Sequence, residues 1–204
     1  MITLYHSKDS RSLRCLWLLQ ELGLPHQVEW VAFPPQLKQP EYLQINPNGT
    51  VPYLIDGENA LRESAAILLY LANRYGHGNC VVPVDSPFYA AMLDWLFYGE
   101  TALAGSLSAA LRYAMFLPRP QRNEVVAQDY REMMVQRLDA LDRALAQGPY
   151  LCGDTFTIAD ISVGYGLLLG ELLGLAPRYP QRIADYLARL KDRPAFLKAR
   201  GLAN

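Results

Sequence analysis

The sequence lacks the cysteine and histidine patterns that hold metals or disulfides. Its three cysteines, Cys15, Cys80 and Cys152, lie far apart and form no CxxC pair, which argues against zinc, a disulfide scaffold and dithiol redox chemistry. Its three histidines show neither HxH nor HExxH spacing, so we expect no metal site. Sparse, unpaired cysteines are typical of a reducing compartment, and we expect the cytoplasm.

The sequence also lacks an excess of charge and a long apolar run. Nineteen basic residues against twenty acidic ones give a net charge of -1, which indicates no general attraction to nucleic acid or membranes. The longest uncharged apolar stretch, 161–170, is far shorter than the roughly 20 residues of a membrane-spanning helix. The first ten residues do not resemble a signal peptide. We therefore expect a soluble protein whose partner is a small molecule or another protein.

The first part of the chain alternates strand and helix patterns. The order of patterns is strand, helix, strand, a proline-rich loop with at most a short helix, two strands and a closing helix, which suits a small mixed sheet with helices on its faces. Glycine and proline after the first helix mark its end. The predicted elements are Ile2–His6, Leu13–Leu22, Gln27–Phe33, Val51–Ile55, Ala60–Arg62 and Ser64–Tyr75.

Beyond this part the composition changes twice. From residue 76 to residue 87 the composition shifts to Gly, His, Asn, Pro, Asp and Ser, which indicates a linker, placed at 78–87, between an N-terminal domain of residues 1–77 and a second domain of residues 88–204. The second domain has helical patterns throughout, and we expect a helical bundle. Its predicted helical segments are Phe88–Leu117, Arg122–Ala146, Ile158–Leu173 and Pro180–Arg193, followed by a tail.

Small hydroxyl residues precede two helices of the N-terminal domain. Ser10 or Ser12 before the first helix, and Ser64 before the last, can cap the helices, and the same positions can bind an anion through a hydroxyl and the first backbone N–H groups. Capping alone explains each serine. The pairing of two such junctions at the same end of a small sheet is less usual, because ligands of α/β sheets bind there.

Other motifs of the helical half favour structural roles. Thr157 and Asp160 have the spacing of a capping box, which predicts a helix start and no ligand contact. Aromatic residues on the first long helix are more often core than pocket. The aromatic residues in question are Trp95, Tyr98, Tyr113 and Phe116.

Three stretches together resemble cytosolic glutathione transferases over nearly the whole chain. They are "SRSLRCLWLLQELGLP", "NPNGTVPYLIDGENALRESAAILLYL" and "YLCGDTFTIADISV". The resemblance implies an α/β thioredoxin-like N-terminal domain (βαβαββα, mixed four-stranded sheet), an all-α C-terminal helical bundle and a homodimer that binds glutathione. It also accounts for Pro52, which breaks a strand pattern at its start: the matching residue of the family is a cis-proline, and the backbone of the residue matching Val51 pairs with the cysteinyl part of glutathione.

The same resemblance assigns residues of this chain to the two ends of glutathione. Glu63 and Ser64 match the pair that receives the γ-glutamyl end, and Lys38 and Asn48 lie where the family contacts the glycine end. Many relatives have a lysine where this chain has Thr50, so one cationic contact is missing. The residues expected to bind glutathione are Arg11, Lys38, Asn48, Thr50, Val51, Pro52, Glu63 and Ser64.

The resemblance leaves several hydroxyls as candidates for the catalytic residue. We expect Ser10, with Ser12 next, because serine-type members carry the hydroxyl just ahead of the helix; Tyr5 and Ser7 are further options, and Cys15 lies too far inside the helix for cysteine-type chemistry. The expected activity is ionisation of the glutathione thiol for attack on a small hydrophobic electrophile.

The second substrate and the activity itself leave alternatives. A non-catalytic ligand-binding or regulatory protein on the same fold, or a glutathione-dependent reductase or isomerase, would use the same glutathione site. The expected electrophile pocket draws on Trp95, Tyr98, Tyr113 and Phe116.

Overall fold

The protein divides into two compact units. A computed structural model describes residues 1–201 of the chain, apart from the side chains of Gln36 and Leu37. The first unit consists of Met1–Val81 together with the chain from Asp192 onward, and the second consists of Val82–Lys191. Neither helix nor strand lies between residues 76 and 88, a stretch that includes the predicted linker.

A mixed sheet of four strands forms the centre of the first unit. Its order is β2-β1-β3-β4, with β1 parallel to β2 and antiparallel to β3, and β3 antiparallel to β4. Alternate residues of β1 are buried, as the period of two in its sequence requires. The strands are β1 (Ile2–His6), β2 (His26–Trp30), β3 (Tyr53–Asp56) and β4 (Asn59–Leu61). The predicted thioredoxin-like arrangement of this half is confirmed.

Two amphipathic helices pack together beside the sheet, α1 (Ser12–Glu21) and α3 (Ser64–Tyr75). Helix α1 buries most of its residues, among them Leu13, Trp17 and Leu18, which accounts for its dense apolar pattern. The proline-rich segment between β2 and β3 forms only a short helix, α2 (Pro35–Lys38), and one 3₁₀ stretch, η1 (Pro40–Gln44). Pro40 disfavours helical backbone at the preceding residue, Gln39, which ends α2 after about one turn.

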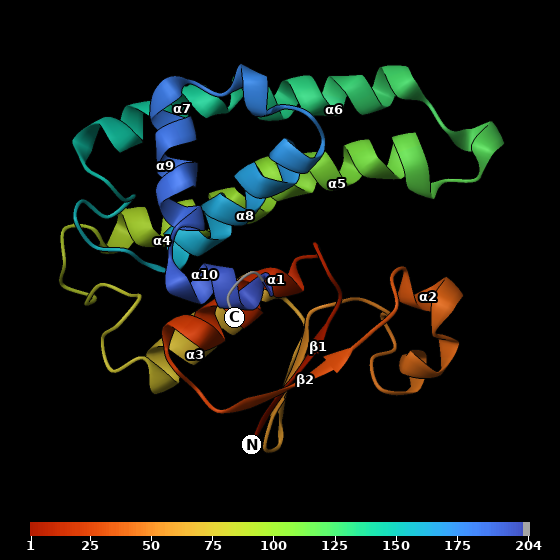
Figure 1. Cartoon of the computed structure of the whole chain (residues 1–204), viewed down its shortest axis with the longest axis horizontal. Helices are drawn as coiled ribbons and strands as arrows, with labels where there is room; N and C mark the ends of the chain where they lie inside the picture. The colour runs from red at the N-terminus through yellow and green to blue at the C-terminus, as the bar shows by residue number, and fades with distance from the viewer. Residues whose placement is uncertain (202–204) are drawn as a thin grey trace. The chain divides into compact units, whose positions relative to one another are not determined.

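The last helix, α10 (Pro194–Ala199), belongs to the first unit, although the sequence places it in the helical half. It packs against α1 (Figure 1). The rings of Trp17 and Phe196 meet edge to face with centroids 4.9 Å apart. Arg193 donates two hydrogen bonds, of 2.6 and 2.8 Å, to the carboxylate of Glu21. These contacts between distant parts of the chain are what return the C-terminal segment to α1.

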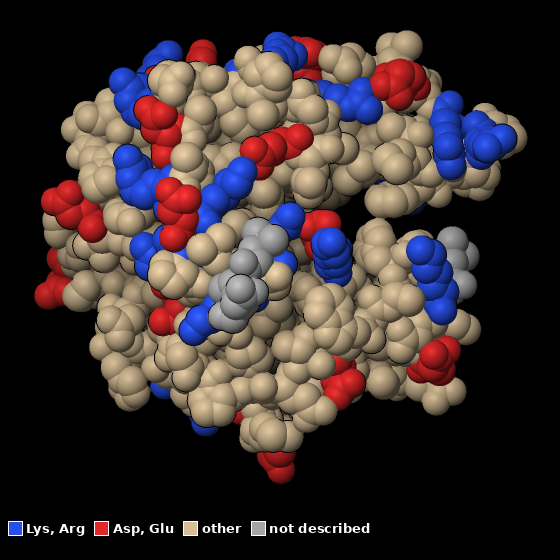
Figure 2. Space-filling model, in the orientation of Figure 1, with Lys and Arg blue, Asp and Glu red and all other residues tan. Residues whose placement is uncertain are grey.

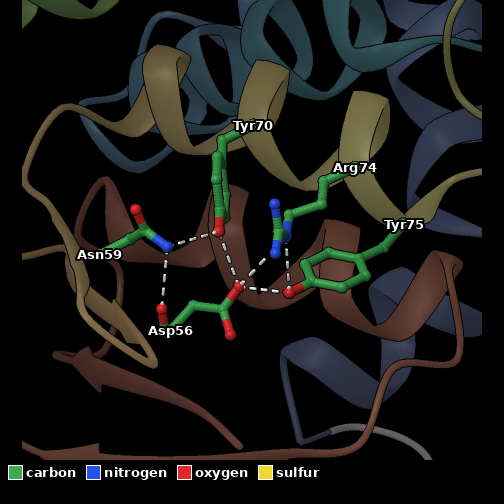
Figure 3. Close-up of polar contacts among 5 residues, drawn as sticks. All are labelled: Asp56, Asn59, Tyr70, Arg74 and Tyr75. Carbon is green, nitrogen blue, oxygen red and sulfur yellow. Dashed lines mark hydrogen bonds and ion pairs between the residues drawn. The ribbon is translucent and has the colours of Figure 1, made fainter.

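A polar cluster fixes the β3–β4 hairpin to α3 (Figure 3). The carboxylate of Asp56 accepts hydrogen bonds from the hydroxyls of Tyr75 and, at 2.8 Å, Tyr70. Arg74 lies 4.0 Å from the same carboxylate oxygen and donates to Tyr75 at 3.1 Å. Asn59 donates to the Asp56 carbonyl at 3.2 Å. The hydrogen bond from Tyr75 is the main reason that the pKa of Asp56 is lowered.

The second unit is a bundle of helices around α8, whose first thirteen residues are buried. The predicted capping box at its start is present, and Thr157 N–H donates to Asp160 at 2.8 Å. The predicted segment 122–146 is divided at Arg137 into α6 and α7. The α-helices of this unit are α4 (Tyr89–Tyr98), α5 (Ser106–Leu111), α6 (Glu124–Gln136), α7 (Leu138–Ala144), α8 (Ile158–Leu172) and α9 (Gln181–Lys191).

The long helical segment predicted at 88–117 contains two π-helical stretches, η2 (Gly99–Gly105) and η3 (Arg112–Phe116). At Gly99 a Cβ atom would lie 2.5 Å from the hydroxyl oxygen of Ser162 on α8. That hydroxyl donates a 2.7 Å hydrogen bond to the Leu96 carbonyl. A side chain that engages a helix carbonyl disturbs the i→i−4 ladder, which accounts for the wider turn that begins here.

Charges are mixed over the face shown in Figure 2, where Lys and Arg side chains alternate with Asp and Glu. This distribution agrees with the net charge of -1. Within residues 1–201, no helix has the length and apolar character needed to cross a membrane.

Candidate functional site

Three of the predicted site segments meet at one end of the sheet. Tyr5, next to the end of β1, pairs with Tyr53 at the start of β3, and Leu54 pairs with Leu61 at the end of β4. The loop after β1, the bond before Tyr53 and the start of α3 therefore lie at the same sheet edge. Strand β2 is parallel to β1, so the segment that follows it and contains Lys38 also leaves from this edge.

The loop between β1 and α1 is tightly folded. Ser7 is buried and donates its hydroxyl to the Val31 carbonyl at 2.5 Å, which ties the loop to the end of β2. Asp9 has a left-handed backbone, with φ of 58°, and Ser10 N–H donates to the Ser7 carbonyl at 3.3 Å. The Asp9 carboxylate also accepts a hydrogen bond from Arg200, beyond α10. The C-terminal segment thus holds the loop that carries the predicted catalytic hydroxyls.

The two predicted catalytic serines form one chain of short hydrogen bonds. The Oγ atoms of Ser10 and Ser12 are 2.7 Å apart, and Ser12 Oγ lies 2.7 Å from Nδ1 of His6. Ser10 Oγ also donates to the Ser7 carbonyl at 2.8 Å. Ser12 is fully buried, whereas Ser10 is half-buried. Of the two hydroxyls, Ser10 is the one with access to a ligand, and Ser12 connects it to His6.

Neither serine is the N-cap of α1 in the strict sense. The N-cap residue is Arg11, which makes no side-chain capping hydrogen bond. Ser10 Oγ nevertheless accepts from Ser12 N–H at 3.3 Å, and Ser12 Oγ accepts from Ser7 N–H at 3.1 Å. Both hydroxyls therefore satisfy backbone donors around the start of the helix.

His6 is a member of this site that sequence reasoning missed. Burial lowers the pKa of its imidazole to about 4, so the ring is neutral at pH 7. The rings of Trp30 and His6 meet edge to face, with their centroids 4.9 Å apart. A neutral imidazole donates through one nitrogen and accepts through the other, which makes its tautomer a property of the site.

The peptide bond between Val51 and Pro52 is cis, as the family resemblance implies. Both residues are buried at the start of β3. The preceding carbonyl, of Thr50, accepts hydrogen bonds from Tyr42 at 2.9 Å and from the buried Asn46 at 2.8 Å. These two donors hold the turn in place, so the backbone of Val51 has a fixed orientation.

The start of α3 contacts a buried charged side chain, the guanidinium of Arg14. Glu63 is the N-cap, with an extended backbone, and Ser64 is the first helical residue. The Ser64 side chain is buried and accepts a 3.1 Å hydrogen bond from Nη1 of Arg14, which is itself fully buried. Sequence reasoning missed Arg14, although a charged residue within the apolar run of α1 is unusual. Burial of a cation requires such polar partners.

The other residues expected to bind glutathione lie at the surface. Arg11 is half-buried and the rest are exposed. Glu63 makes no capping hydrogen bond with its side chain. The exposed residues are Lys38, Asn48, Thr50 and Glu63.

The four aromatic residues expected in an electrophile pocket lie at two separate places along one continuous helical segment, with Trp95 and Tyr98 at one and Tyr113 and Phe116 at the other. The ring centroids of Trp95 and Tyr98 are 4.8 Å apart. The Tyr98 hydroxyl donates a 2.7 Å hydrogen bond to the Arg137 carbonyl. Tyr113 stacks on Tyr130 with centroids 6.3 Å apart, and Phe116 is 52% exposed. Fifteen residues of helix between Tyr98 and Tyr113 span roughly 20 Å. The four side chains are therefore too far apart to form a single small pocket.

No cluster of three or more His, Cys, Asp or Glu side chains that could hold a metal ion occurs within residues 1–201.

Comparisons with known proteins are consistent with these findings. A family model described as "Glutathione S-transferase, N-terminal domain" matches residues 4–79, and one described as "Glutathione S-transferase, C-terminal domain" matches residues 124–167. An uncharacterized GST-like protein of Streptococcus mutans is 33% identical over 78% of this chain and 63% of its own length.

Two further relatives match over nearly the whole chain. The glutathione S-transferase-like protein OpS6 of Beauveria bassiana is 30% identical, with 97% of this chain and 93% of that protein covered. A glutathione transferase family member from Pseudomonas fluorescens, whose crystal structure has two glutathione bound, is 26% identical and has a TM-score of 0.81, with 98% of this chain and 92% of that chain covered.

Proposed function

The chain belongs to the glutathione S-transferase family, and from that premise we propose that it ionises the thiol of glutathione and transfers it to a small hydrophobic electrophile. The observation that carries the proposal is the meeting of three segments at one sheet edge: the Ser10 loop, the Val51–Pro52 turn and the start of α3. The glutathione seen in the related P. fluorescens structure supports the choice of ligand.

In the proposed complex, glutathione lies along this edge. The backbone of Val51 pairs with the cysteinyl unit in the manner of an added strand. The hydroxyl of Ser64 and the first N–H groups of α3 receive the γ-glutamyl carboxylate, since a helix N-terminus favours negative charge. Glu63 receives the α-amino group. Lys38 and Asn48 receive the glycine end, with Arg11 and Thr50 near it.

Ser10 is proposed as the catalytic residue because its hydroxyl is the accessible end of the hydrogen-bond chain. A thiol of pKa near 8.5 must fall by about two units to be mostly ionised at neutral pH, which requires ~2.7 kcal/mol. One hydrogen bond to a charged sulfur contributes ~1.5–3 kcal/mol. The start of α1 adds ~0.3–1 kcal/mol. These contributions suffice without a metal.

For the electrophile we propose the Tyr113–Phe116 end of the helical segment over the Trp95–Tyr98 pair. Met115 and Phe116 are 56% and 52% exposed, so this end offers apolar surface. The Tyr98 hydroxyl is already engaged by the Arg137 carbonyl. Replacement of Phe116 by Ser is expected to raise the KM for an apolar electrophile and to leave glutathione affinity unchanged.

The test of the proposed function combines calorimetric titration with glutathione and turnover with a panel of electrophiles. We expect Ser10→Ala to cut turnover at pH 7 by tenfold or more while glutathione affinity changes little. Ser108→Ala is the matched control, because that hydroxyl donates to the Ala104 carbonyl of its own helical segment, in the second unit. Glutathione binding without turnover would instead favour the ligand-binding alternative, and absence of binding would refute the proposal.

We also propose a cytoplasmic homodimer. The dimer rests on family membership, and the compartment rests on the three widely spaced cysteines, which form no CxxC motif. Sedimentation of the purified protein tests the oligomeric state.

A further inference from the structure

We infer that His6 carries its proton on Nδ1 and thereby directs the hydrogen-bond chain outward, from His6 to Ser12 to Ser10, so that Ser10 points its own proton toward the sulfur of bound glutathione. This inference rests on the proposed function and deepens it. His6 acts through the two serines, so it is a positioning residue.

Three short contacts among His6, Ser12, Ser10 and the Ser7 carbonyl must share the available protons. His6 Nδ1 to Ser12 Oγ is 2.7 Å, Ser12 Oγ to Ser10 Oγ is 2.7 Å, and Ser10 Oγ to the Ser7 carbonyl is 2.8 Å. Each contact needs one hydrogen between its two atoms, and the carbonyl supplies none. The two hydroxyls supply one each. The third must come from the imidazole, which places it on Nδ1.

The other tautomer leaves the chain one proton short. If Nε2 carried the proton, Ser12 would donate to Nδ1 and Ser10 would have to donate to Ser12. Ser10 Oγ and the Ser7 carbonyl oxygen would then face each other at 2.8 Å with no hydrogen between them. Two acceptors at that separation repel, since neither has a donor to offer.

Two backbone donors agree with the outward direction, whereas the contact of Ser12 Oγ with the Ser7 carbonyl, at 3.3 Å, is longer than the three contacts of the chain and receives no hydrogen in it. Ser12 Oγ accepts from Ser7 N–H at 3.1 Å, and Ser10 Oγ accepts from Ser12 N–H at 3.3 Å. In this direction each of the two hydroxyl oxygens donates one hydrogen bond and accepts two. Aligned hydrogen bonds polarise one another, which strengthens the last donor in the chain, the Ser10 hydroxyl.

The surroundings of His6 keep the ring neutral, so only one of its nitrogens carries a proton. His6 is 2% exposed, and its burial lowers the pKa of the imidazole. Asp9 is the nearby charge that opposes this shift. His6 also lines a cavity of about 450 Å³ within the first unit, between α1, β2 and the end of α10. The other titratable or charged residues that line it are Lys8, Asp9, His26, Lys198 and Arg200.

Binding of glutathione then requires a rotation of the Ser10 side chain. Its Oγ moves away from the Ser7 carbonyl and turns its proton to the thiolate sulfur, while Ser12 continues to donate to Ser10 Oγ. The thiol proton leaves to bulk water, so His6 gains no proton. With the opposite tautomer, Ser10 would direct its proton to Ser12 and would present a lone pair to the sulfur.

The direct test is the tautomer of His6 in the intact protein saturated with glutathione. Nitrogen NMR of protein labelled at histidine distinguishes a protonated from an unprotonated ring nitrogen, and the His6 signals are those absent from a His6→Asn variant. We expect Nδ1 to be protonated and Nε2 unprotonated at pH 7. A proton on Nε2 alone would overturn the inference.

A second measurement follows the thiol itself, through the ultraviolet absorbance of bound thiolate against pH. We expect His6→Leu to raise the pKa of the thiol of bound glutathione by about one unit, a tenfold fall in the ratio of thiolate to thiol, while the affinity for the thiol form of glutathione, measured below that pKa, stays unchanged. His26→Asn is the matched control, because His26 lines the same cavity but bonds to the Leu24 carbonyl instead of the serines. An unchanged thiol pKa in folded His6→Leu would also overturn the inference.

The two levels of failure are distinguishable. If wild-type protein binds no glutathione, the proposed function fails and the NMR experiment has no complex to examine. If glutathione binds and its thiol pKa is lowered, but His6 has the opposite tautomer, only the inference fails. Should His6→Leu not fold, the tautomer in the wild-type complex decides the question by itself.

Discussion

Arg14 and Ser64 are both buried and are joined by a 3.1 Å hydrogen bond that links the first turn of α1 to the first residue of α3. The two helices carry different parts of the proposed site, and this hydrogen bond fixes the position of α1 relative to α3. A guanidinium with no exposed surface depends on its acceptors, because a buried charge without them is costly.

We therefore predict that Ser64→Ala destabilises the protein by about 2 kcal/mol, the usual cost of removing a partner from a buried charged donor. Glutathione affinity should fall at least tenfold in the same variant. Urea unfolding and calorimetric titration give the two quantities. A double-mutant cycle with Arg14→Met should show a coupling of about 1–2 kcal/mol.

The second unit supplies a matched control for this pair. Arg137 Nη1 donates to Ser106 Oγ at 2.8 Å, and Ser106 is buried. Ser106→Ala should destabilise the protein as well, but leave glutathione affinity unchanged. Equal losses of affinity in the two variants would mean that Ser64 acts only through overall stability.

The local elements of this chain could be predicted because each has a pattern within a few residues. The alternation in β1, the apolar run of α1 and the Thr157–Asp160 capping box are of this kind, and the capping box is confirmed. Helix α10 has such a pattern too, but nothing in it tells that it packs on α1. That contact depends on Trp17, about 180 residues away in the sequence.

The site could be predicted in part for the same reason. Serines before helices are visible in the sequence, whereas the Arg14–Ser64 bond joins residues 50 positions apart. A signal for His6 did exist. His6 lies on the same face of β1 as Ile2 and Leu4, and both of those residues are buried. The alternation that predicts the strand therefore also predicts an inward-facing imidazole, which needs a hydrogen-bond partner.

The ion pair between Asp9 and Arg200 leads to a second prediction, about loop order. Asp9 is 35% exposed and Arg200 20%, so the pair should contribute less than about 1 kcal/mol to global stability. Its effect should be local, because Asp9 precedes Ser10. We expect Arg200→Met to accelerate amide exchange at residues 7–10 and to lower kcat, with Arg200→Lys closer to wild type. Unchanged exchange in Arg200→Met would show that the ion pair does not order the loop.

A third prediction concerns acid stability and His6. The folded-state pKa of about 4 lies below the unfolded value of 6.5, so the unfolded chain binds the proton more tightly. The stability that follows is fully present above pH 6.5 and is lost as the pH falls toward 4, by up to about 3 kcal/mol. His6→Asn cannot titrate and should flatten this part of the profile. Amide exchange of β1 and α1 measures the free energy of unfolding of the first unit against pH. An identical slope of this profile in wild type and variant would contradict the assignment of the pH dependence to His6.

The fourth prediction has the opposite sign and concerns Asp160 in the second unit. Burial raises its pKa to about 6, although its carboxylate accepts hydrogen bonds from Leu151 N–H at 3.0 Å, Thr157 N–H at 2.8 Å and the Tyr186 hydroxyl at 2.9 Å. The folded state now binds the proton more tightly than the unfolded chain, whose pKa is 3.8. This contribution is present below pH 3.8 and is lost as the pH rises to 6, by up to about 3 kcal/mol.

Asp160→Asn tests that sign directly. The amide NH₂ must face a backbone N–H that cannot turn away, at a cost of about 1–3 kcal/mol, and the variant no longer titrates. The stability gap between wild type and variant should therefore be widest near pH 4 and should narrow as the pH rises to 7. Amide exchange along α8 measures the gap, and Asp185→Asn, on the exposed side of α9, serves as the control. A gap that widens with pH would mean that the carboxylate is held in its charged form, because its hydrogen bonds from Leu151, Thr157 and Tyr186 would then outweigh its burial.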